Sequence, residues 1–363
     1  MSLTMRKDLV MRRVLIAAGG TAGHVVPALA VAERLSAAGA EVVFAGGERA
    51  EAELVPAAGY ELRTFRVEGL SRTNPLRAAR AVARAGAGVV AAQRLLSELR
   101  PAVVLGGGGY VSAPVGLAAL TRRIPLVLTE ADSHLGVANR LLARGARRVC
   151  LAFPIEGRDG PRYRVTGRPV PPPACDPAAA RARFGLSEAE LCVLVFGGSL
   201  GARTINEAAV EAFAAAPFHV LHAAGARDHA ALGRRVGGPH YDLRPYIDDF
   251  GDALAACDLC VARAGGSIFE IAAAGKPAIL VPYPYASADH QTSNARWMAA
   301  AGAAVCVPDA ELTPARLGQE VGALLGDPSR LASMAAASAA LARPDAAQAV
   351  ADEVLAAARE RSS

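Results

Sequence analysis

The chain has 363 residues, enough for about two domains, and carries a formal net charge of +5 with a pI near 9.0. Hydrophobic residues make up 52% of it and charged residues 20%, a composition that excludes an intrinsically disordered protein. The glycines cluster instead of recurring at every third position, which excludes a collagen-like repeat.

The N-terminus and the cysteines point to an intracellular protein. Residues 1–12 carry basic side chains, but no apolar stretch with a cleavage site follows, so we expect no secretory signal. Uncharged stretches such as residues 297–308 are shorter than the ~20 residues that a membrane-spanning helix needs, so we expect no transmembrane segment. The six cysteines are scattered. The pair Cys257 and Cys260 lacks further ligands at zinc-binding spacing, which favours ordinary buried thiols in a reducing, cytoplasmic setting.

Short apolar strands alternate with helical patterns along the chain. A first strand over residues 14–18 leads into a glycine turn and a helix over residues 27–38, with Pro27 in the first turn of that helix. The same order recurs about half the chain later, where a strand ending at Phe196 precedes a glycine turn and a helix over residues 205–216. Strands are predicted over residues 42–45, 103–105, 126–129, 191–196, 220–222, 259–262 and 278–281.

This alternation predicts an α/β fold, because continuous apolar strands separated by helices form parallel sheets that are covered on both faces. We expect two Rossmann-like domains that face each other across a cleft. The N-terminal domain spans residues 1–167, the proline-rich residues 168–177 form a stiff linker, and the C-terminal domain spans residues 178–343. Residues 344–363 have helical spacing and either complete the second domain or return to the first.

Three glycine-rich turns follow strands, at residues 19–23, 106–109 and 197–201. Such a turn lets the backbone approach an anion, and the following helix directs free amide groups and its positive dipole end at that anion. The turns therefore favour phosphate groups as ligands, the alternative being plain tight turns. None has P-loop spacing, and the first lacks the spacing of a dinucleotide fingerprint. Glu41, near the next strand, leaves an oxidoreductase open as an alternative.

Two titratable residues stand next to glycine turns. His24 ends the first turn, where a helix begins; an imidazole there can take a proton from a sugar hydroxyl, or it can simply cap the helix or bind a phosphate. Glu270 falls in the first turns of the helix that follows the glycines at residues 265–266. Its carboxylate can accept both hydroxyls of a ribose, or it can be a helix N-terminal charge stabilised by the dipole.

Five segments together resemble one known family. They are GGTAGHVVP at residues 19–27, GGGYVSAP at 107–114, VTG at 165–167, GGSLGAR at 197–203 with Asn206, and the stretch from Glu270 to Pro277. With these motifs in order over about residues 12–345, the chain resembles the MurG family of peptidoglycan N-acetylglucosaminyltransferases, in glycosyltransferase family 28. The resemblance implies a GT-B fold.

The resemblance also implies a reaction. GlcNAc would pass from UDP-GlcNAc, with inversion, to the C4 hydroxyl of MurNAc in undecaprenyl-diphospho-MurNAc-pentapeptide, converting lipid I to lipid II for peptidoglycan synthesis. It implies neither a metal ion nor a cofactor, because amide groups at a helix N-terminus can stabilise the departing UDP.

Matched position by position, the resemblance assigns roles to individual residues. His24 is the expected catalytic base. Contacts with UDP-GlcNAc are expected from Thr21, Ala22, Gly23, Asp132, Arg168, Ser199, Ile247, Gly266, Ser267, Ile268, Glu270 and Gln291. Within that set the expected partners are a phosphate for Ser199, the uracil for the Ile247 backbone, the ribose for Glu270 and the GlcNAc for Gln291. The acceptor diphosphate is expected at Gly20, Gly107, Gly108, Gly109 and Tyr110.

The sequence departs from the family pattern at four places. Asp132 stands where the family has an asparagine, in a Thr-Glu-Ala-Asp segment that keeps only the glutamate. Pro171 replaces a phosphate-binding arginine, and Arg168 is a candidate to substitute for it. Leu200 replaces a glutamine, and the segment over residues 263–270 is one residue shorter than the common pattern.

A lipid acceptor implies a peripheral enzyme at the cytoplasmic face of the cell membrane. Residues 70–100 support this expectation, because such a basic, partly apolar segment can bind an anionic membrane surface; an ordinary solvated helix face is the alternative. The segment carries Glu98, the arginines Arg72, Arg77, Arg80, Arg84, Arg94 and Arg100, and the apolar residues Leu76, Val82, Val89, Val90, Leu95 and Leu96.

Other partners and functions are weighed against this one. A cell-wall synthesis complex is a further candidate partner, and no motif for nucleic-acid binding is present. Two other functions stay open. One is another GT-B glycosyltransferase with a lipid or natural-product acceptor, and the other is a non-catalytic protein that binds a UDP-sugar or a lipid diphosphate.

Overall fold

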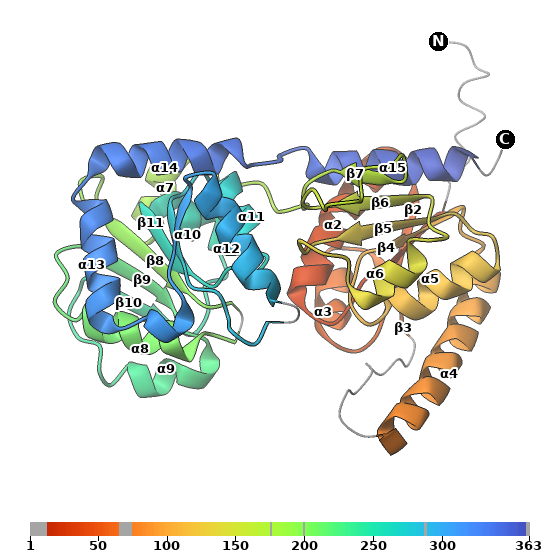
Figure 1. The fold of residues 1–363 in the computed structure, drawn as a ribbon, viewed down its shortest axis with the longest axis horizontal. Coiled ribbons are helices and arrows are strands. Elements are labelled where there is room, and N and C mark those ends of the chain that lie inside the picture. Colours follow the sequence, from red (N-terminus) through yellow and green to blue (C-terminus); the bar gives the residue numbers. More distant parts are fainter. Residues whose placement is uncertain (1–12, 65–74, 175, 199, 287–288, 361–363) are drawn as a thin grey trace, which may run out of the picture. The chain divides into compact units, whose positions relative to one another are not determined.

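The computed structural model describes residues 13–64, 75–174, 176–198, 200–286 and 289–360, with the backbone alone for residues 75–85 (Figure 1). The chain divides into two compact units. The N-terminal unit comprises residues 1–170 and 343–363, and the C-terminal unit comprises residues 171–342. The first division falls within the segment 168–177, where the sequence predicts a linker, and the second falls beside residue 343.

The N-terminal unit is built on a parallel sheet. Within the described residues this sheet has seven strands in the order β3-β2-β1-β4-β5-β6-β7. The strands are β1 (Arg13–Ala17), β2 (Glu41–Gly46), β3 (Glu61–Thr64), β4 (Val103–Gly106), β5 (Leu126–Glu130), β6 (Arg148–Leu151) and β7 (Tyr163–Val165). The helices are α2 (Ala22–Ala37), α3 (Ala50–Ala57), α4 (Pro75–Leu99), α5 (Ser112–Thr121), α6 (Val137–Leu142) and α15 (Ala346–Glu360).

Both faces of this sheet are buried, as its apolar strands require. Along β1, Val14 and Ile16 belong to one hydrophobic cluster, whereas Leu15 and Ala17 belong to a second cluster. The side chains of a strand alternate between the two faces, so β1 contributes to both cores. Helices α4 and α5 cover one face, and α2 and α15 cover the other.

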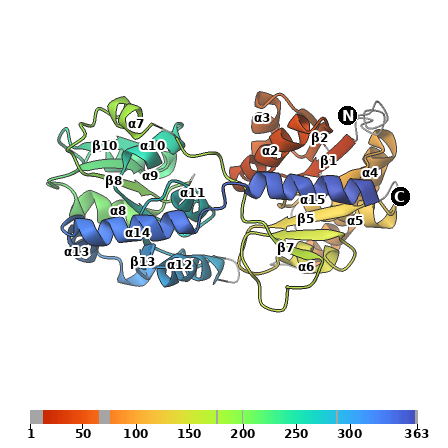
Figure 2. The same cartoon turned by 90° about the horizontal axis from the view of Figure 1, so that it is seen from above.

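The C-terminal helix α15 lies in the N-terminal unit, against α2 (Figure 2). Its apolar positions, including Val350 and Val354, are fully buried in the cluster that α2 also lines. At its exposed side, Glu353 accepts a hydrogen bond of 2.9 Å from Arg148 of β6. Helix α15 therefore covers one face of the sheet from which the first glycine turn leaves.

The C-terminal unit repeats the same plan. Within the described residues its sheet has six parallel strands in the order β10-β9-β8-β11-β12-β13. They are β8 (Cys192–Phe196), β9 (His219–Ala223), β10 (Tyr241–Arg244), β11 (Leu259–Ala262), β12 (Ala278–Leu280) and β13 (Ala304–Cys306). The helices are α7 (Pro177–Arg183), α8 (Arg203–Ala212), α9 (Ala226–Leu232), α10 (Phe250–Ala256), α11 (Ile268–Ala273), α12 (His290–Ala300), α13 (Pro314–Leu325) and α14 (Pro328–Ala340), with a short 3₁₀ turn, η2 (Asp309–Glu311).

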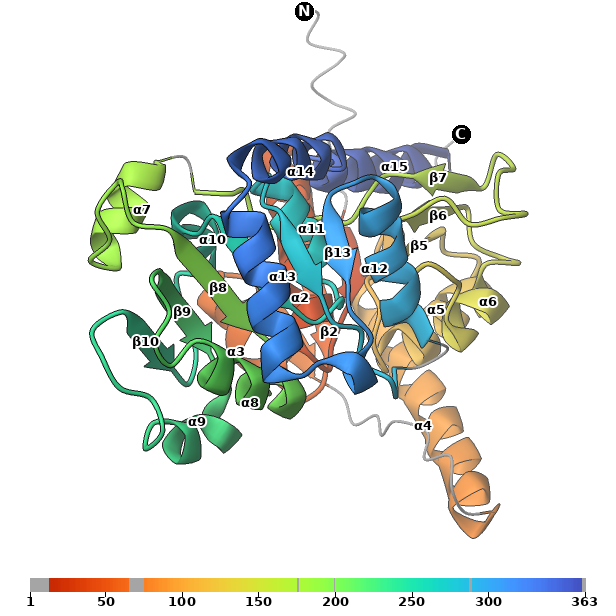
Figure 3. The ribbon, with the colours of Figure 1, turned by 60° about the vertical axis from the view of Figure 1, so that its left-hand side comes forward.

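Helices α8 and α13 pack together on one face of this second sheet (Figure 3). Ile205 of α8 and Val321 of α13 are fully buried in the same cluster as Val193 and Val195 of β8. The alternation of apolar strands with amphipathic helices thus produces the two parallel sheets that the sequence predicts.

The predicted strands are all present, with ends that shift by a residue or two, but two predicted helix starts were wrong. Helix α2 begins at Ala22 and not at Pro27, which lies inside it. Helix α8 runs over Arg203–Ala212, earlier than the predicted 205–216. Both helices begin directly after their glycine turns, where Thr21 and Ala202 in extended conformations form the N-caps.

The expectation that helix α4 offers its apolar residues to a membrane was also wrong for part of the helix. Leu96 is buried, and Val89 and Leu95 pack against the core cluster that α5 lines, because this half of α4 covers the sheet. Val90, Arg94 and Arg100 are exposed. Leu76 and Val82, with Arg72, Arg77, Arg80 and Arg84, lie outside the residues whose side chains the structure describes. Of the described helices, none has the length and apolar character to cross a membrane.

Candidate active site

In each sheet, ligands are expected where the strand order reverses, at the carboxyl ends of the strands. In the N-terminal unit this switch point lies between the neighbouring strands β1 and β4. The glycine turn of residues 18–21 leaves β1 there, and the turn of residues 107–110 leaves β4 beside it. The two motifs, distant in sequence, are therefore adjacent in the fold.

The first turn is held by a buried carboxylate that belongs to none of the sequence motifs. Glu51, near the start of α3, has no exposed surface. Its carboxylate accepts hydrogen bonds from the amide of Gly20 at 2.8 Å, the amide of Gly47 at 2.9 Å and the hydroxyl of Tyr110 at 2.7 Å. Burial alone would raise the pKa of Glu51, but these donors outweigh it and lower the pKa, so the carboxylate is ionised.

The second turn packs directly on the first. Gly108 and Gly109 have positive φ angles of 97° and 78°, which favour glycine. A Cβ atom on Gly109 would collide with the carbonyl oxygen of Gly19, and one on Gly108 would lie 2.7 Å from Nδ1 of His24. The glycines therefore allow a close approach of the two turns, with the His24 ring against Gly108.

Several amides of these turns already have partners inside the protein. The Gly107 amide donates to the carbonyl oxygen of Ala17 at 2.9 Å, and the Gly108 amide donates to the hydroxyl of Ser112 at 2.9 Å. With the Gly20 amide bound to Glu51, these three glycines give the turns their shape, and their amides do not face a ligand. Thr21, Ala22 and Gly23 are exposed at the start of α2, where helix amides lack intrahelical acceptors.

His24 is the third residue of α2 and is partly buried at the same edge. Burial is the main reason that its pKa is lowered; the charge of Arg168 lowers it further, whereas the charge of Asp132 opposes the shift. The imidazole is therefore mostly neutral at pH 7, the form that accepts a proton.

Arg168 binds the start of the same helix at a carbonyl oxygen that Pro27 leaves without its helical donor. Pro27 has no amide hydrogen, so the carbonyl oxygen of Gly23 lacks the donor that an ordinary helix would supply four residues later. The Arg168 guanidinium donates to that oxygen at 2.6 Å. This hydrogen bond holds a positive charge beside Gly23, the residue that precedes His24.

Asp132 follows the next strand, β5, in a loop held by Glu130. The Glu130 carboxylate accepts hydrogen bonds from the amides of Asp132 at 3.2 Å and Gly136 at 2.8 Å, and from Nδ2 of Asn139 at 3.0 Å. Burial raises the pKa of Glu130 despite these donors. Within the Thr-Glu-Ala-Asp segment, only the glutamate matches the family pattern. This residue, Glu130, shapes the loop that carries Asp132.

In the C-terminal unit the switch point lies between β8 and β11. The third glycine turn leaves β8 there and leads into α8, with φ angles of 91° at Gly198 and 72° at Gly201. A side chain at Gly201 would collide with the carbonyl oxygen of Ala224. Ser199, the expected phosphate contact, lies outside the described residues.

A buried polar network holds the carbonyl oxygen on which this turn packs. Nδ2 of Asn206, on α8, donates to the carbonyl oxygen of Ala224 at 2.8 Å, and its Oδ1 lies 3.1 Å from Nε2 of His222. Nδ1 of His222 lies 2.8 Å from the hydroxyl of Tyr241. Burial lowers the pKa of His222 to about 4, so the ring is neutral and both of its nitrogens have a partner. Of the residues in this network, only Asn206 belongs to a motif identified in the sequence.

The segment after β11 carries further expected donor contacts. Gly266 and Ser267 precede α11, and Glu270 is the third residue of that helix and partly exposed. Oε1 of Gln291, on α12, accepts a hydrogen bond of 2.9 Å from the amide of Tyr283, and its Nε2 would lie 3.8 Å from a Cβ on Gly265.

Two expected donor contacts have side chains in the core of the C-terminal unit. Ile247 is 3% exposed and Ile268 is fully buried. Their backbones, and not their side chains, are therefore what each can offer to a ligand.

An ion pair that no sequence motif indicates fixes the start of the segment after β11. Nη1 of Arg263, which is 8% exposed, lies 2.5 Å from Oδ1 of Asp309 and 3.2 Å from each of the carbonyl oxygens of Val281 and Pro282. The pair joins the end of β11 to the loop after β12 and to η2. A partner that is 46 residues away along the chain leaves no local pattern that could reveal the pair.

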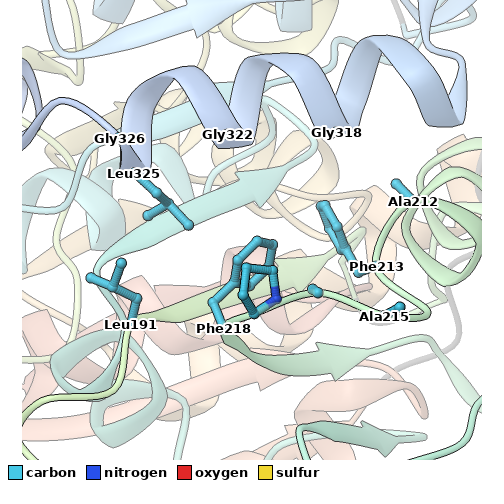
Figure 4. Close-up of a pocket in the computed structure, with 11 residues that line it drawn as sticks. Leu191, Ala212, Phe213, Ala215, Phe218, Gly318, Gly322, Leu325 and Gly326 are labelled. Carbon is cyan, nitrogen blue, oxygen red and sulfur yellow. The ribbon is translucent and has the colours of Figure 1, made fainter.

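An apolar pocket of about 440 Å³ lies away from these turns (Figure 4). Phe213, Phe218 and Leu191 line it opposite Gly318 and Gly322 of α13. It sits at the amino ends of β8 and β9, the opposite edge of the sheet from the glycine turns, and offers no charged group in its lining. It is therefore not the candidate site.

No cluster of three or more potential metal ligands occurs among the residues that the structure describes. Cys257 and Cys260 are buried free thiols where α10 leads into β11, with their sulfur atoms 3.7 Å apart. Their hydrogen bond and their burial raise the pKa of Cys260, which keeps that thiol protonated. They are the ordinary buried thiols that the sequence indicates.

Two parallel sheets, each with a glycine turn at its switch point, are the architecture of GT-B glycosyltransferases, the fold class that the family resemblance implies. Residues 14–151 match the N-terminal domain of glycosyltransferase family 28, and residues 192–350 match the C-terminal domain of that family. The chain belongs to glycosyltransferase family 28.

Particular relatives define its place within that family. A protein of Moorella thermoacetica named UDP-N-acetylglucosamine--N-acetylmuramyl-(pentapeptide) pyrophosphoryl-undecaprenol N-acetylglucosamine transferase is 42% identical over 364 residues, covering 94% of this chain and 98% of the relative. A protein of the same name from Nitrosococcus oceani is 44% identical over 351 residues, with the same coverage of 94% and 98%. The crystal structure of MurG from Acinetobacter baumannii superposes with a TM-score of 0.75 at 30% identity, covering 95% of this chain and 99% of that one.

Proposed function

We propose that this chain transfers GlcNAc from UDP-GlcNAc to the C4 hydroxyl of MurNAc in undecaprenyl-diphospho-MurNAc-pentapeptide, with inversion at the anomeric carbon, so that lipid I becomes lipid II. Support comes from the names of relatives that are 42% and 44% identical over nearly the whole chain. The structural observation that carries the proposal is His24, a neutral imidazole at the start of α2 beside two glycine turns.

The chemistry assigned to His24 is general-base catalysis. Its Nδ1 side lies against Gly108, so Nε2 is the nitrogen that we assign to the acceptor hydroxyl. As Nε2 takes the proton, the C4 oxygen forms its bond to the anomeric carbon of GlcNAc and the bond from that carbon to the UDP oxygen breaks on the opposite face. The charge that develops on UDP would be stabilised by amides at the start of α8.

The donor is assigned mainly to the C-terminal unit. Ser199 would contact a phosphate, the Ile247 backbone the uracil, Glu270 the ribose and Gln291 the GlcNAc, with Gly266, Ser267 and Ile268 lining the same site. From the N-terminal unit, Thr21, Ala22, Gly23, Asp132 and Arg168 would contribute. The fixed guanidinium of Arg168, one residue from His24, supports its assignment as the cation that replaces the arginine missing at Pro171.

The acceptor diphosphate is assigned to the paired turns of Gly20, Gly107, Gly108, Gly109 and Tyr110. Since three of these glycines use their amides internally, the hydrogen-bond donors proposed for the anion are the exposed amides at the start of α2, so that Thr21, Ala22 and Gly23 would lie beside both the UDP-GlcNAc and the acceptor diphosphate. A lipid acceptor would place the enzyme at the cytoplasmic face of the membrane, where exposed basic residues such as Arg94 and Arg100 would contact the anionic surface, and a cell-wall synthesis complex is a candidate partner.

A turnover assay tests this function. The purified full chain, given UDP-GlcNAc and a lipid I analogue, is expected to form the disaccharide product and UDP. His24→Ala is expected to lower kcat by about 10²–10⁴ while UDP still binds, because general-base catalysis typically contributes that factor. A full rate in this variant would refute the assigned base. Binding of both substrates without product would favour a non-catalytic protein, and turnover with a different acceptor only would favour another glycosyltransferase.

A further inference from the structure

The ionised carboxylate of Glu51 touches three loops but has no place in the reaction described above. Glu51 is fully buried, and its three donors come from the loops that follow β1, β2 and β4: Gly20, Gly47 and Tyr110. These strands are neighbours in the sheet, in the order β2-β1-β4. One carboxylate thus joins the carboxyl ends of three strands at the edge where both glycine turns lie.

The surrounding glycines leave room for this carboxylate. A Cβ on Gly19 would lie 2.7 Å from Oε1 of Glu51, and one on Gly46 would lie 2.8 Å from its Cγ. A Cβ on Gly47 would collide with the Tyr110 hydroxyl. Side chains at these positions would displace Glu51 or Tyr110, so the turns and the carboxylate form one packed arrangement.

Tyr110 is fixed by this arrangement, and with it a cation. Burial and the hydrogen bond to Glu51 raise the pKa of Tyr110 to about 12, so its hydroxyl remains a donor to the carboxylate. The guanidinium of the exposed Arg49 stacks on the Tyr110 ring, 5.0 Å from its centroid. The position of Glu51 therefore determines where the first turn, the second turn and the Arg49 charge lie.

We propose that Glu51 is a positioning residue for the diphosphate of the acceptor: it holds both glycine turns, and through Tyr110 the Arg49 guanidinium, in the geometry that receives the anion. The inference rests on the proposed function. Glu51 does not touch the substrate in this arrangement, because each of its carboxylate oxygens already accepts hydrogen bonds from the protein. Its own negative charge is stabilised by these three donors.

Glu51→Gln tests this proposal, because an amide of the same shape keeps one accepting oxygen but presents donors to the groups that the other oxygen now binds. We expect the KM for the lipid acceptor to rise about tenfold, equivalent to ~1.4 kcal/mol, with the KM for UDP-GlcNAc unchanged. Glu53→Gln is the matched control, since Glu53 is exposed on the same helix and loses the same charge. It is expected to leave both KM values unchanged.

Tyr110→Phe provides a second variant that removes only one of the three hydrogen bonds. We expect a smaller rise in the acceptor KM, and a double variant whose effect is less than the product of the two single effects, because both act on one network. A Glu51→Gln variant that is less stable to urea but keeps its acceptor KM would show a purely structural role and overturn the proposal. An equal rise in both KM values would overturn it as well.

A binding measurement separates this proposal from the proposed function. If the wild-type chain forms no product, the proposed function fails, and the inference is then judged by calorimetry with inorganic pyrophosphate and the full chain. Glu51→Gln is expected to weaken pyrophosphate binding about tenfold, whereas Glu53→Gln is expected to leave it unchanged. Equal affinities in all three proteins, or no binding by the wild type, would overturn the positioning role.

Discussion

The guanidinium of Arg168 donates a 2.6 Å hydrogen bond to the carbonyl oxygen of Gly23, an oxygen that Pro27 leaves without its usual helical partner. The residue after Gly23 is His24, whose pKa is lowered by burial and by Arg168 and raised by Asp132. A single helix start therefore brings together the candidate base and two charges of opposite sign. Asp132 is one of the expected departures from the family pattern, and Arg168 lies three residues before another, Pro171.

Removing the positive charge is expected to shift the pH dependence of turnover upward. In Arg168→Gln the pKa of His24 rises toward its ordinary value, so the imidazole becomes protonated, and inactive as a base, at a higher pH. The loss of kcat/KM relative to wild type at pH 6 is expected to exceed the loss at pH 8 by a factor of ~3. A pH profile of kcat/KM measures this, with the exposed Arg144→Gln as control. A pH-independent loss would mean that Arg168 acts only in binding.

Removing the negative charge of Asp132 is expected to shift the acid side of the kcat/KM profile to lower pH. The charge of Asp132 raises the pKa of His24, so Asp132→Asn lowers this pKa and keeps the imidazole neutral at more acidic pH. The ratio of kcat/KM in the variant to kcat/KM in the wild type is expected to be ~2-fold higher at pH 6 than at pH 8. Shifts in the same direction for Arg168→Gln and Asp132→Asn would contradict the electrostatic explanation for both residues.

The sequence was sufficient to predict the fold and less so to predict the site. Strands such as β8, with the sequence CVLVF, are apolar throughout because both sheet faces are covered, and this pattern is visible in a single sequence. The edge strands β3, with the sequence ELRT, and β10, with YDLR, were not predicted, because they are half-exposed and lack that pattern. The inner strand β6, with the short sequence RVCL, was not predicted either. The start of α2 was misplaced because Pro27 suggested an N-terminal position, whereas Arg168 compensates for the proline inside the helix.

The glycine turns and His24 could be found from sequence because their spacing after a strand has a local physical meaning. Glu51 and Arg263 could not, since each has partners that are distant along the chain and that only the fold brings close. Tyr110, for example, is 59 residues from Glu51 along the chain. A buried carboxylate in a helix with ordinary amphipathic neighbours carries no local signal of the loops that it holds.

The buried network under the third glycine turn is expected to affect the donor alone. Asn206→Ala leaves the carbonyl oxygen of Ala224 and a His222 nitrogen without their partner, which is expected to cost about 1–3 kcal/mol of unfolding free energy. Because Gly201 packs on that carbonyl, we expect the KM for UDP-GlcNAc to rise several-fold with the acceptor KM unchanged. Steady-state kinetics and urea unfolding check this. Glu211→Ala, at an exposed position of α8, is the control, and a selective change in the acceptor KM would contradict the assignment of the donor to this unit.

His222 is expected to make the stability of the protein depend on pH. Its pKa of about 4 in the folded protein lies below the ~6.5 of an unfolded histidine, so the unfolded state binds the proton more readily. The stabilisation is fully present above pH 6.5 and is lost as the pH falls toward 4, by about 2 kcal/mol between pH 7 and pH 5. The neutral variant His222→Gln removes this contribution. The drop in unfolding free energy between the two pH values, measured in urea, should be smaller in His222→Gln than in wild type by that amount. The same drop in both proteins would show that the His222 proton is not responsible.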